Sequence, residues 1–289
     1  MQKDIVIGAI TNYNWDQVKC WVNSLDQSGF DGSKILLCYD ISYDVAEELT
    51  KRNYSILAFK KNDEEKRLEY PKENWNICLE RFLHIWYFLN KLQNKEQYRY
   101  VIATDVGDVI FQTNPSEWLE KNIGKKQLNV GSECIQYKNE EWNKQNMYLS
   151  FGPLVYENMQ DKLVYNAGAI AGKFDSFLDL CYNIFLSSGG APVNVPGGGA
   201  ADQAALNVLL SMKYISDITN FAKSQDGWAA QLEIMANPSK IEKLKDFVTE
   251  PRLRIENGEV YTYDNKKYCI VHQYDVIPEL SKYIREKYA

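Results

Sequence analysis

The stretch that decides the fold is Tyr98-Arg-Tyr-Val-Ile-Ala-Thr-Asp-Val-Gly-Asp-Val-Ile-Phe111. Its apolar part, residues 100–103, is typical of a buried strand in a parallel sheet. The strand leads into two carboxylates, Asp105 and Asp108, with only a valine and a glycine between them. Because ligands of open α/β sheets bind beyond the carboxyl ends of the strands, we expect these two side chains at a binding edge.

Two carboxylates at such an edge suit a hard divalent cation. Mg²⁺ and Mn²⁺ prefer oxygen ligands, and they commonly share a site with substrate phosphates. The alternative is that one aspartate caps a turn and the other is solvated, since Asp is common in turns. Both interpretations stay open on this segment alone.

Strand and helix patterns alternate through the first half of the chain. Strands are predicted at residues 5–10, 34–39, 55–59 and 100–103. Helices are predicted at residues 15–25, 45–52 and 74–92, and a charged loop at 60–69. This alternation is typical of an α/β domain in which helices flank a mostly parallel central sheet.

The second half of the chain is less regular. Residues 141–160 are polar and aromatic, which predicts loop and a short strand, whereas residues 174–187 predict a helix. Residues 188–201 form a glycine-rich loop, which is either a plain flexible connection or a lid on the acceptor side. A helix is predicted after it at 203–212, and Asp202 would cap this helix. Asn257-Gly258 between two strand-like runs predicts a hairpin. With no internal repeat and no linker, we expect one domain.

The composition argues against several classes of protein. A net charge of −6 over 289 residues argues against a nucleic-acid-binding surface. Six scattered cysteines form no CxxC pair, which favours reduced thiols in a cytoplasmic protein over zinc sites or a disulfide framework. The sequence opens on a strand-like run and has no apolar run of ~18 residues, so we expect no transmembrane anchor.

Four segments carry reactive or ligating side chains in a fixed order. They are residues 104–112, 165–172, 202–207 and 271–275. In this order and spacing they resemble the nucleotide-sugar-dependent glycosyltransferases of the GT-A fold. The style of the motifs is most similar to that of the glycogenin-like and bacterial lipooligosaccharide galactosyltransferases. The resemblance extends from the first strand to His272. It implies a single Rossmann-like domain over residues 1–289, with a nucleotide-binding half to about residue 115 and an acceptor-binding half from about residue 116.

The resemblance implies a metal site. Asp105 and Asp108 match the acidic pair that binds a divalent cation, Mn²⁺ or Mg²⁺, which bridges the donor diphosphate. The family separates its two carboxylates by one residue, whereas two residues separate them here. His272 matches the late histidine that is the third metal ligand in the galactosyltransferases.

The resemblance also implies the contacts to the donor. The donor sugar and the acceptor would lie against Asn166, Ala167 and Gly168, and Asp202 with Gln203 would contact the transferred sugar. The nucleoside would lie along the end of the first strand, at Ala9, Ile10, Thr11 and Asn12. We also count Thr104, directly before the acidic pair, among the substrate-binding residues.

Glycosyl transfer needs charge stabilisation at two places. The departing diphosphate gains negative charge, which a divalent cation stabilises as a Lewis acid. The sugar carbon becomes oxocarbenium-like, so an oxygen of Asp202 or Gln203 would help. Further cations for the diphosphate would come from Lys66, Arg67 and Arg81, unless these side chains are simply solvated.

The two histidines of the chain receive different predictions. His84 lies in a mostly apolar helical run, and buried histidines usually just satisfy hydrogen bonds, so we expect a core residue. His272 follows the strand-like run 268–271 at a predicted strand end, a place that favours a ligand.

The sequence therefore predicts a metal-dependent glycosyltransferase. It would move a sugar from a nucleoside diphosphate sugar, UDP-linked, to a glycan hydroxyl with retention of configuration; Asp202 and Asp226 stay open as inverting bases. One alternative is a sugar-1-phosphate nucleotidyltransferase, although residues 9–15 lack the Gly-rich basic loop that it would need. The other is a non-catalytic glycan-binding protein, which would not need the set Asp105, Asp108 and His272.

Overall fold

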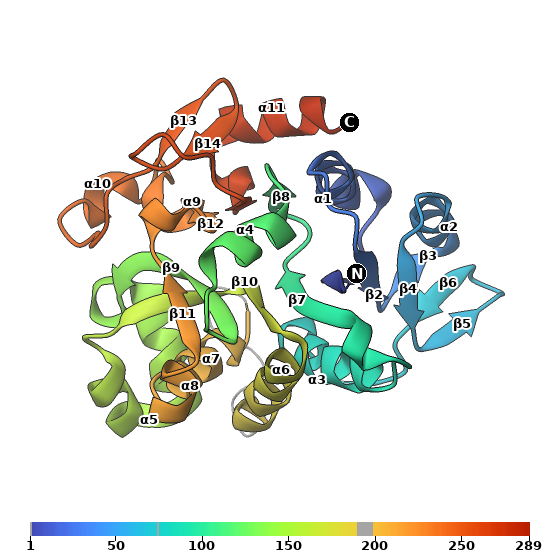
Figure 1. Ribbon diagram of the computed structural model, residues 1–289, viewed down its shortest axis with the longest axis horizontal. Coiled ribbons are helices and arrows are strands. Elements are labelled where there is room, and N and C mark those ends of the chain that lie inside the picture. Colours follow the sequence, from blue (N-terminus) through green and yellow to red (C-terminus); the bar gives the residue numbers. More distant parts are fainter. Residues whose placement is uncertain (1, 74, 190–198) are drawn as a thin grey trace.

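The central element of the fold is a seven-stranded sheet within the part of the chain that the computed structural model describes, residues 2–73, 75–189 and 199–289 (Figure 1). In spatial order its strands are β11 (Thr219–Ala222), β9 (Leu128–Gln136), β10 (Leu163–Lys173), β7 (Tyr98–Thr104), β1 (Lys3–Ile10), β2 (Ser33–Cys38) and β4 (Ser55–Ala58). Strand β10 pairs antiparallel with both of its neighbours, and the other pairings are parallel. The predicted α/β fold with a mostly parallel sheet is confirmed.

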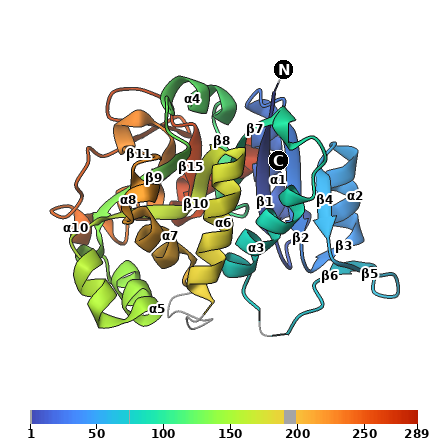
Figure 2. The same ribbon diagram turned by 60° about the horizontal axis from the view of Figure 1, so that its bottom comes forward.

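Helices cover both faces of this sheet because its strands are apolar on both sides. On β1, Val6 and Ile10 pack into one core cluster with Trp21, while Ile5 and Ile7 pack into another with Phe82. The first cluster lies under α1 (Trp15–Gln27), α2 (Tyr43–Lys51) and α4 (Pro115–Asn122). The second lies under α3 (Ile77–Asn90), α6 (Phe174–Ser188) and α7 (Asp202–Leu210), and Figure 2 shows α3 and α6 side by side. Because successive side chains of a strand point to opposite faces of the sheet, each strand packs against both helical layers.

A smaller sheet extends the binding edge of the large one. Its strand order is β12 (Ala229–Gln231), β15 (Ile270–His272) and β8 (Val109–Phe111). His272, the last residue of the central strand β15, lies opposite Gln231 on one side and Val109 on the other. The small sheet thereby brings the end of the chain to the segment that follows β7.

The remaining elements lie around these two sheets. The short strands are β3 (Ile41–Ser42), β5 (Lys60–Asn62), β6 (Arg67–Glu69), β13 (Arg254–Glu256) and β14 (Glu259–Tyr261). The further helices are α5 (Glu141–Met159), α8 (Lys213–Ser216), α9 (Leu232–Met235), α10 (Ile241–Leu244) and α11 (Pro278–Lys287), with 3-10 turns η1 (Lys95–Gln97), η2 (Tyr137–Asn139), η3 (Ser224–Asp226) and η4 (Tyr274–Val276). Among the described residues, no helix combines the length and the apolar character that crossing a bilayer requires. All six cysteines are free thiols.

The prediction of loop and short strand for residues 141–160 is wrong. The segment forms the helix α5, which is broken at Gly152, where φ is 79°. Two of its inward-facing residues are asparagines, and both have buried hydrogen-bond partners. Asn143 donates to Glu133, and Asn146 donates to the carbonyl of Ala200. Polar residues on the buried face hide the apolar periodicity by which an amphipathic helix is recognised.

The prediction of a charged loop at residues 60–69 is also wrong. Strands β5 and β6 form a hairpin there, and Glu69 accepts hydrogen bonds from Asn62 (2.6 Å) and Lys60 (3.4 Å) across it. Both faces of the hairpin carry polar residues, so the sequence shows no alternation of apolar and polar positions.

Two further expectations concern the segment before α7. Asp202 does not cap this helix: Ala201 holds the N-cap position, and the Asp202 side chain bonds to Arg81 instead. Most of the glycine-rich loop, residues 190–198, lies outside the described residues, and with it the lid hypothesis. The predicted hairpin at Asn257-Gly258 is confirmed, since it joins β13 to β14 with positive φ at both turn residues.

Candidate active site

Asp105 and Asp108 follow β7 at the carboxyl edge of the sheet, as the sequence predicts. The backbone N–H of Asp105 donates to the carbonyl of Gly168 on the neighbouring strand β10 (2.9 Å). The carbonyl of Asp108 accepts from the N–H of Gln273 (2.8 Å). Strand β10 and the residue that follows β15 therefore fix the backbone at the two aspartates.

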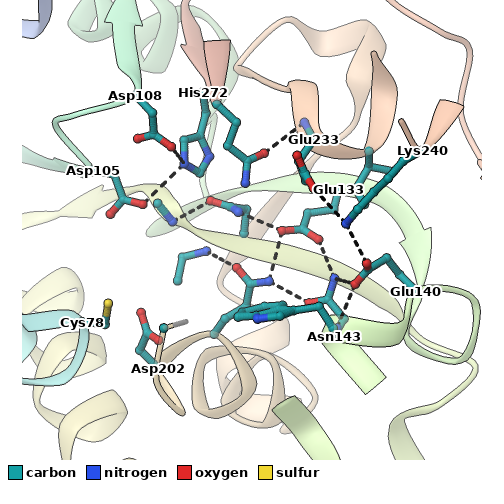
Figure 3. A pocket seen from close by; sticks show the side chains of 18 of the residues that line it. Cys78, Asp105, Asp108, Glu133, Glu140, Asn143, Asp202, Glu233, Lys240 and His272 are labelled. Atoms are coloured by element: carbon teal, nitrogen blue, oxygen red, sulfur yellow. Dashed lines mark hydrogen bonds and ion pairs between the residues drawn. The ribbon is translucent and has the colours of Figure 1, made fainter. Parts of the chain in front are cut away.

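His272 lies between these two carboxylates. Its Nε2 is 3.4 Å from Oδ2 of Asp105 and 3.4 Å from Oδ2 of Asp108. One ligand atom from each of the three residues lies within 4.8 Å of the other two. Figure 3 shows the imidazole directed at both carboxylates. The sequence prediction that these three residues meet in space agrees with this geometry.

Gln231 orients the imidazole from the other side. His272 Nδ1 lies 2.8 Å from Oε1 of Gln231. Since an amide oxygen only accepts hydrogen bonds, Nδ1 carries the proton, and in the neutral tautomer the Nε2 lone pair is directed at the carboxylates. Metal-binding histidines are typically held through their other nitrogen in this way.

The electrostatics of the group are those of a cation site. Burial would lower the pKa of His272, but the carboxylates of Asp108 and Asp105 raise it to about 10. Burial would raise the pKa of Asp105, but Arg81 and His272 lower it well below its usual range. Two closely spaced carboxylates thus attract a positive charge, which a proton on His272 or a cation beside it can provide.

Gly168 leaves the room that a cation would need. A Cβ at this position would come within 2.6 Å of Asp105 Oδ2 and 2.6 Å of His272 Cε1. Any larger residue would push these two side chains out of place. Two carboxylates, one oriented imidazole and this free space fit a divalent cation such as Mn²⁺ or Mg²⁺.

Arg81 links the acidic pair to Asp202. Its guanidinium forms ion pairs with Asp105 and with Asp202 (3.1 Å), and it also donates to the carbonyl of Ala167 (3.4 Å). The carboxylates of Asp105 and Asp202 raise the pKa of Arg81 although its burial acts in the opposite direction. Burial raises the pKa of Asp202 to about 6, and Arg81 opposes this shift. Arg81 therefore compensates two carboxylates at once.

Two cavities meet at these residues. The larger, about 560 Å³, extends from Asp105, Asp108 and His272 towards Asn166, Asp202 and Gln203. The smaller, about 430 Å³, extends towards the end of β1 and reaches α11. Four residues line both cavities: Cys78, Arg81, Asp105 and Asp108. The candidate metal site thus lies at the junction of two binding spaces.

A buried amide network forms one wall of the larger cavity. Glu133 on β9 accepts hydrogen bonds from Asn166 (2.8 Å), Asn143 (2.9 Å) and Gln203 (3.1 Å) (Figure 3). Burial raises the pKa of Glu133. Gln203 also accepts from the N–H of Ala167 (3.1 Å). The network fixes the orientation of the amide groups that face the cavity.

Most of the predicted site residues line one of the two cavities. Asn166, Ala167, Gly168, Asp202 and Gln203 line the larger one, Ala9 and Thr11 line the smaller one, and Arg81 lines both.

Five predicted substrate-binding residues line neither cavity, and Asp226 does not line one either. Ile10 is fully buried in the core, and the hydroxyl of Thr104 accepts from the Trp21 indole (2.8 Å). Lys66 is exposed in the turn of the β5–β6 hairpin, where its φ is 51°. Arg67 donates to Asn12 (3.3 Å) and to the carbonyl of Asp40 (3.1 Å), so Arg67 and Asn12 contact each other beside the end of β1. Asp226, weighed as a base, is exposed and accepts from the N–H of Lys223 in η3.

Several residues that line the cavities escape the sequence analysis. They are Tyr13, Gln17, Asp275 and Arg285 at the smaller cavity and Glu133, Glu140, Asn143, Glu233 and Lys240 at the larger one. Glu133 lies on the buried strand β9, but this strand also contains Asn129 and Ser132, so its sequence does not single out Glu133. The others lie in polar stretches where nothing distinguishes a lining residue from a solvated one.

Comparison with known proteins agrees with this architecture. No protein-family model matches the sequence, and no curated protein matches it. The chain is similar in structure to the bifunctional glycosyltransferase WbbM, with a TM-score of 0.54 over 94% of this chain at 12% identity. It is also similar to two structures of the glycosyltransferase GlyE from Streptococcus pneumoniae, with TM-scores of 0.51 and 0.52 over 100% and 99% of this chain at 11% and 13% identity. The chain adopts a GT-A-like glycosyltransferase fold.

The similarity concerns the fold. The GT-A-like chain spans 45% of the WbbM chain and 63% of each GlyE chain. Because one fold can host many activities, the activity has to be argued from the site.

Proposed function

We propose that this chain is a metal-dependent glycosyltransferase that moves a sugar from a nucleoside diphosphate sugar to a glycan hydroxyl. The observation that carries the proposal is the group Asp105, Asp108 and His272 at the junction of two cavities. A donor of this class has three parts, a nucleoside, a diphosphate and a sugar. A junction with a separate space on each side matches these three parts.

The smaller cavity would hold the nucleoside and the diphosphate. Ala9, Thr11 and Tyr13 follow β1 along one wall, where a nucleoside would lie. Arg285 of α11 contributes a guanidinium to the same cavity. Since Arg81 already compensates two carboxylates, Arg285 is the better cation for the diphosphate.

Asp105, Asp108 and His272 would hold Mn²⁺ or Mg²⁺. When bound, the cation would supply Lewis-acid stabilisation of the departing diphosphate. Gln231 keeps the imidazole in its ligating tautomer, and Gly168 keeps space free in front of it. These residues hold the diphosphate end of the donor at the mouth of the larger cavity.

The larger cavity would hold the transferred sugar. Asp202 and Gln203, in the first turn of α7, and Asn166 on β10 line this space. A carboxylate near the sugar carbon stabilises the positive charge that develops there. Arg81 holds Asp202 in place, so this charge is oriented before the donor binds.

Retention of configuration is part of the proposal. An inverting enzyme needs a carboxylate that takes the proton of the acceptor hydroxyl. Glu133 accepts three amide hydrogen bonds and Asp202 is paired with Arg81, so neither is arranged as a free base. The UDP preference and retention both follow the resemblance to the galactosyltransferases, and NMR of the anomeric proton of the product tests the second.

A donor panel tests the proposal directly. The purified protein is incubated with UDP-, GDP- and dTDP-sugars, with Mn²⁺ or with EDTA, and release of the nucleoside diphosphate is measured. We expect release from a UDP-sugar that EDTA abolishes and that Asp108→Asn lacks, while Asp226→Asn, a matched change outside the cavities, keeps it. Formation of a nucleotide sugar from a nucleoside triphosphate would indicate a nucleotidyltransferase instead. Glycan binding that EDTA leaves unchanged, without donor turnover, would indicate a glycan-binding protein.

A further inference from the structure

In the proposed function the donor occupies only the part of the larger cavity that Asn166, Asp202 and Gln203 line. Further lining residues of this cavity are Glu140, Trp142, Glu233, Ile234 and Lys240, and the Trp142 ring lies beside Gly199. Figure 3 shows Glu140, Glu233 and Lys240 on the side of the pocket opposite to Asp105 and Asp108. At about 560 Å³ the cavity lies in the range of pockets that enclose drug-sized ligands, so it has room for more than one monosaccharide. We call the four residues Glu140, Trp142, Glu233 and Lys240 the distal cluster.

Three separate elements build the distal cluster. Lys240, before α10, places its Nζ 3.0 Å from Oε1 of Glu140 and 2.9 Å from Oε1 of Glu233. Glu140 is the N-cap of α5, and Glu233 lies in the first turn of α9. The Glu140 side chain is 7% exposed, whereas Glu233 and Lys240 are 27% and 31% exposed. The buried carboxylate of Glu140 thus anchors Lys240, which in turn pairs with Glu233, and both of these side chains stay partly exposed.

Hydrogen bonds tie the distal cluster to the donor side of the cavity. Asn143 donates to Oε2 of Glu140 (3.1 Å) and to Oε2 of Glu133 (2.9 Å). Oδ1 of the same asparagine accepts from Gln203 (2.8 Å). The distal cluster is therefore held in a fixed position relative to Gln203, which would contact the transferred sugar.

The charge of the cavity restricts what can bind at its distal end. Of the described residues that line the cavity, six are carboxylates, and the positive charges that oppose them are those of Arg81 and Lys240 and of a proton or a cation at His272. A divalent cation would leave this balance negative, and a donor diphosphate adds further negative charge. A second anion at the distal cluster would meet two carboxylates for one ammonium group. An uncharged polyol would not meet this repulsion.

We propose that the distal cluster is the acceptor subsite and that it selects an uncharged sugar over one bearing a carboxylate or phosphate. This inference rests on the proposed function and adds the acceptor class to it. The carboxylate of Glu233 accepts hydrogen bonds from sugar hydroxyls and Lys240 donates one, while the buried Glu140 holds Lys240 in place. The Trp142 indole, a large apolar ring with a polar N–H, packs against the C–H face of the sugar.

Matched pairs of glycans test this proposal. Neutral glycans and their uronic-acid counterparts, which differ only in the carboxylate of the terminal sugar, are displayed on an array and probed with the protein in the presence of Mn²⁺ and UDP. We expect at least tenfold stronger binding to the neutral member of a pair. Trp142→Ala and Glu233→Gln should each lose this binding at least tenfold, whereas Glu242→Gln, on the exposed side of α10, should keep it.

Donor turnover in water, measured with the same variants, separates this proposal from the proposed function. The wild type and Glu242→Gln should release UDP from the donor sugar at the same rate. The acceptor subsite would be overturned, with donor turnover intact, if neutral and acidic glycans bound equally. It would also be overturned if the wild type bound no neutral glycan more strongly than Trp142→Ala does. Absence of donor turnover in every variant, the wild type included, would overturn the proposed function itself.

Discussion

The two histidines of this chain occupy two regions with opposite electrostatics. His84 on α3 is 8% exposed and His272 at the end of β15 is 3% exposed, so the two are buried alike. Burial, with a smaller contribution from Lys72, lowers the pKa of His84 to about 4, whereas neighbouring carboxylates raise that of His272 to about 10 despite its burial. Burial alone therefore does not decide the charge of a histidine.

The carboxylates around each ring explain the difference. Glu80, which lies near His84, forms an ion pair with Lys72, and the His84 ring packs among Tyr39, Phe59 and Tyr70. A hydrogen-bonded chain satisfies the neutral ring, since Tyr39 can donate to Nδ1 while Nε2–H donates to Tyr70 and Tyr70 donates to Glu80. At His272 two carboxylates face the same nitrogen. One histidine is a core residue, and the other belongs to the candidate metal site.

Removing one carboxylate from the His272 region should have the largest effect. Asp108→Asn takes away a proposed metal ligand, and metal assistance contributes several kcal/mol to such reactions. We expect metal-dependent release of UDP to fall roughly a thousandfold, which corresponds to about 4 kcal/mol. Circular dichroism and thermal melting should show an intact fold. Turnover near the wild-type level would remove Asp108 from the reaction.

Asp202 extends the comparison of the two regions to a second carboxylate. It is buried and has a cationic partner, as Glu80 has. Its proposed role is on the sugar rather than on the metal. Asp202→Asn should lower kcat about a hundredfold while UDP affinity stays near the wild-type value, as for an interaction made mainly in the transition state. Loss of UDP affinity in proportion to kcat would instead assign Asp202 to the nucleotide or metal site.

Gln231 tests whether the tautomer of His272 matters. Gln231→Leu removes the acceptor for Nδ1–H, and such changes around a metal site typically weaken metal binding 10- to 100-fold. Gln231→Glu keeps an acceptor oxygen in the same place and should retain most of the affinity. Titration of Mn²⁺ into each variant measures this. Equal weakening by both substitutions would point to a packing effect rather than to the tautomer.

His84 should affect stability and not metal binding. Its folded pKa of about 4 lies below the ordinary value of 6.5, so the unfolded chain binds the proton more tightly. The contribution of His84 to stability is therefore present above about pH 6.5 and is lost as the pH falls towards 4. Urea unfolding at several pH values should show a steeper loss for the wild type than for His84→Gln, by up to about 3 kcal/mol. Parallel pH profiles would mean that His84 titrates normally.

Much of the fold could be predicted from the sequence because its signals are local. The strand at residues 100–103, the helix that contains His84 and the turn at Asn257-Gly258 each show in the periodicity or the residue types of one short segment. The helix α5 could not be predicted in this way. Its buried asparagines are polar because they bond to Glu133 and to the carbonyl of Ala200, which are distant in the sequence.

The residues of the candidate site also fall into those that local sequence signals predict and those that tertiary contacts place. Asp105, Asp108, Asn166, Asp202 and His272 stand in short motifs of recognisable type and order, and the fold brings them together. Of the cations that the sequence suggests, Arg81 lines both cavities, but Lys66, Arg67 and Arg285 all lie in charged stretches and could not be told apart. The hairpin of β5 and β6 keeps Lys66 and Arg67 out of the cavities, while packing of α11 beside α1 brings Arg285 to the smaller one. Such placements depend on tertiary contacts alone.

Binding of Mn²⁺ to the two histidine variants tests the central claim most directly. Mn²⁺ is titrated at neutral pH, with UDP present, into the wild type, His272→Ala and His84→Gln, and free Mn²⁺ is followed by electron paramagnetic resonance. The account predicts one bound Mn²⁺ in the wild type and in His84→Gln with similar affinity, and at least tenfold weaker binding in His272→Ala. Equal affinity in the wild type and His272→Ala would contradict it.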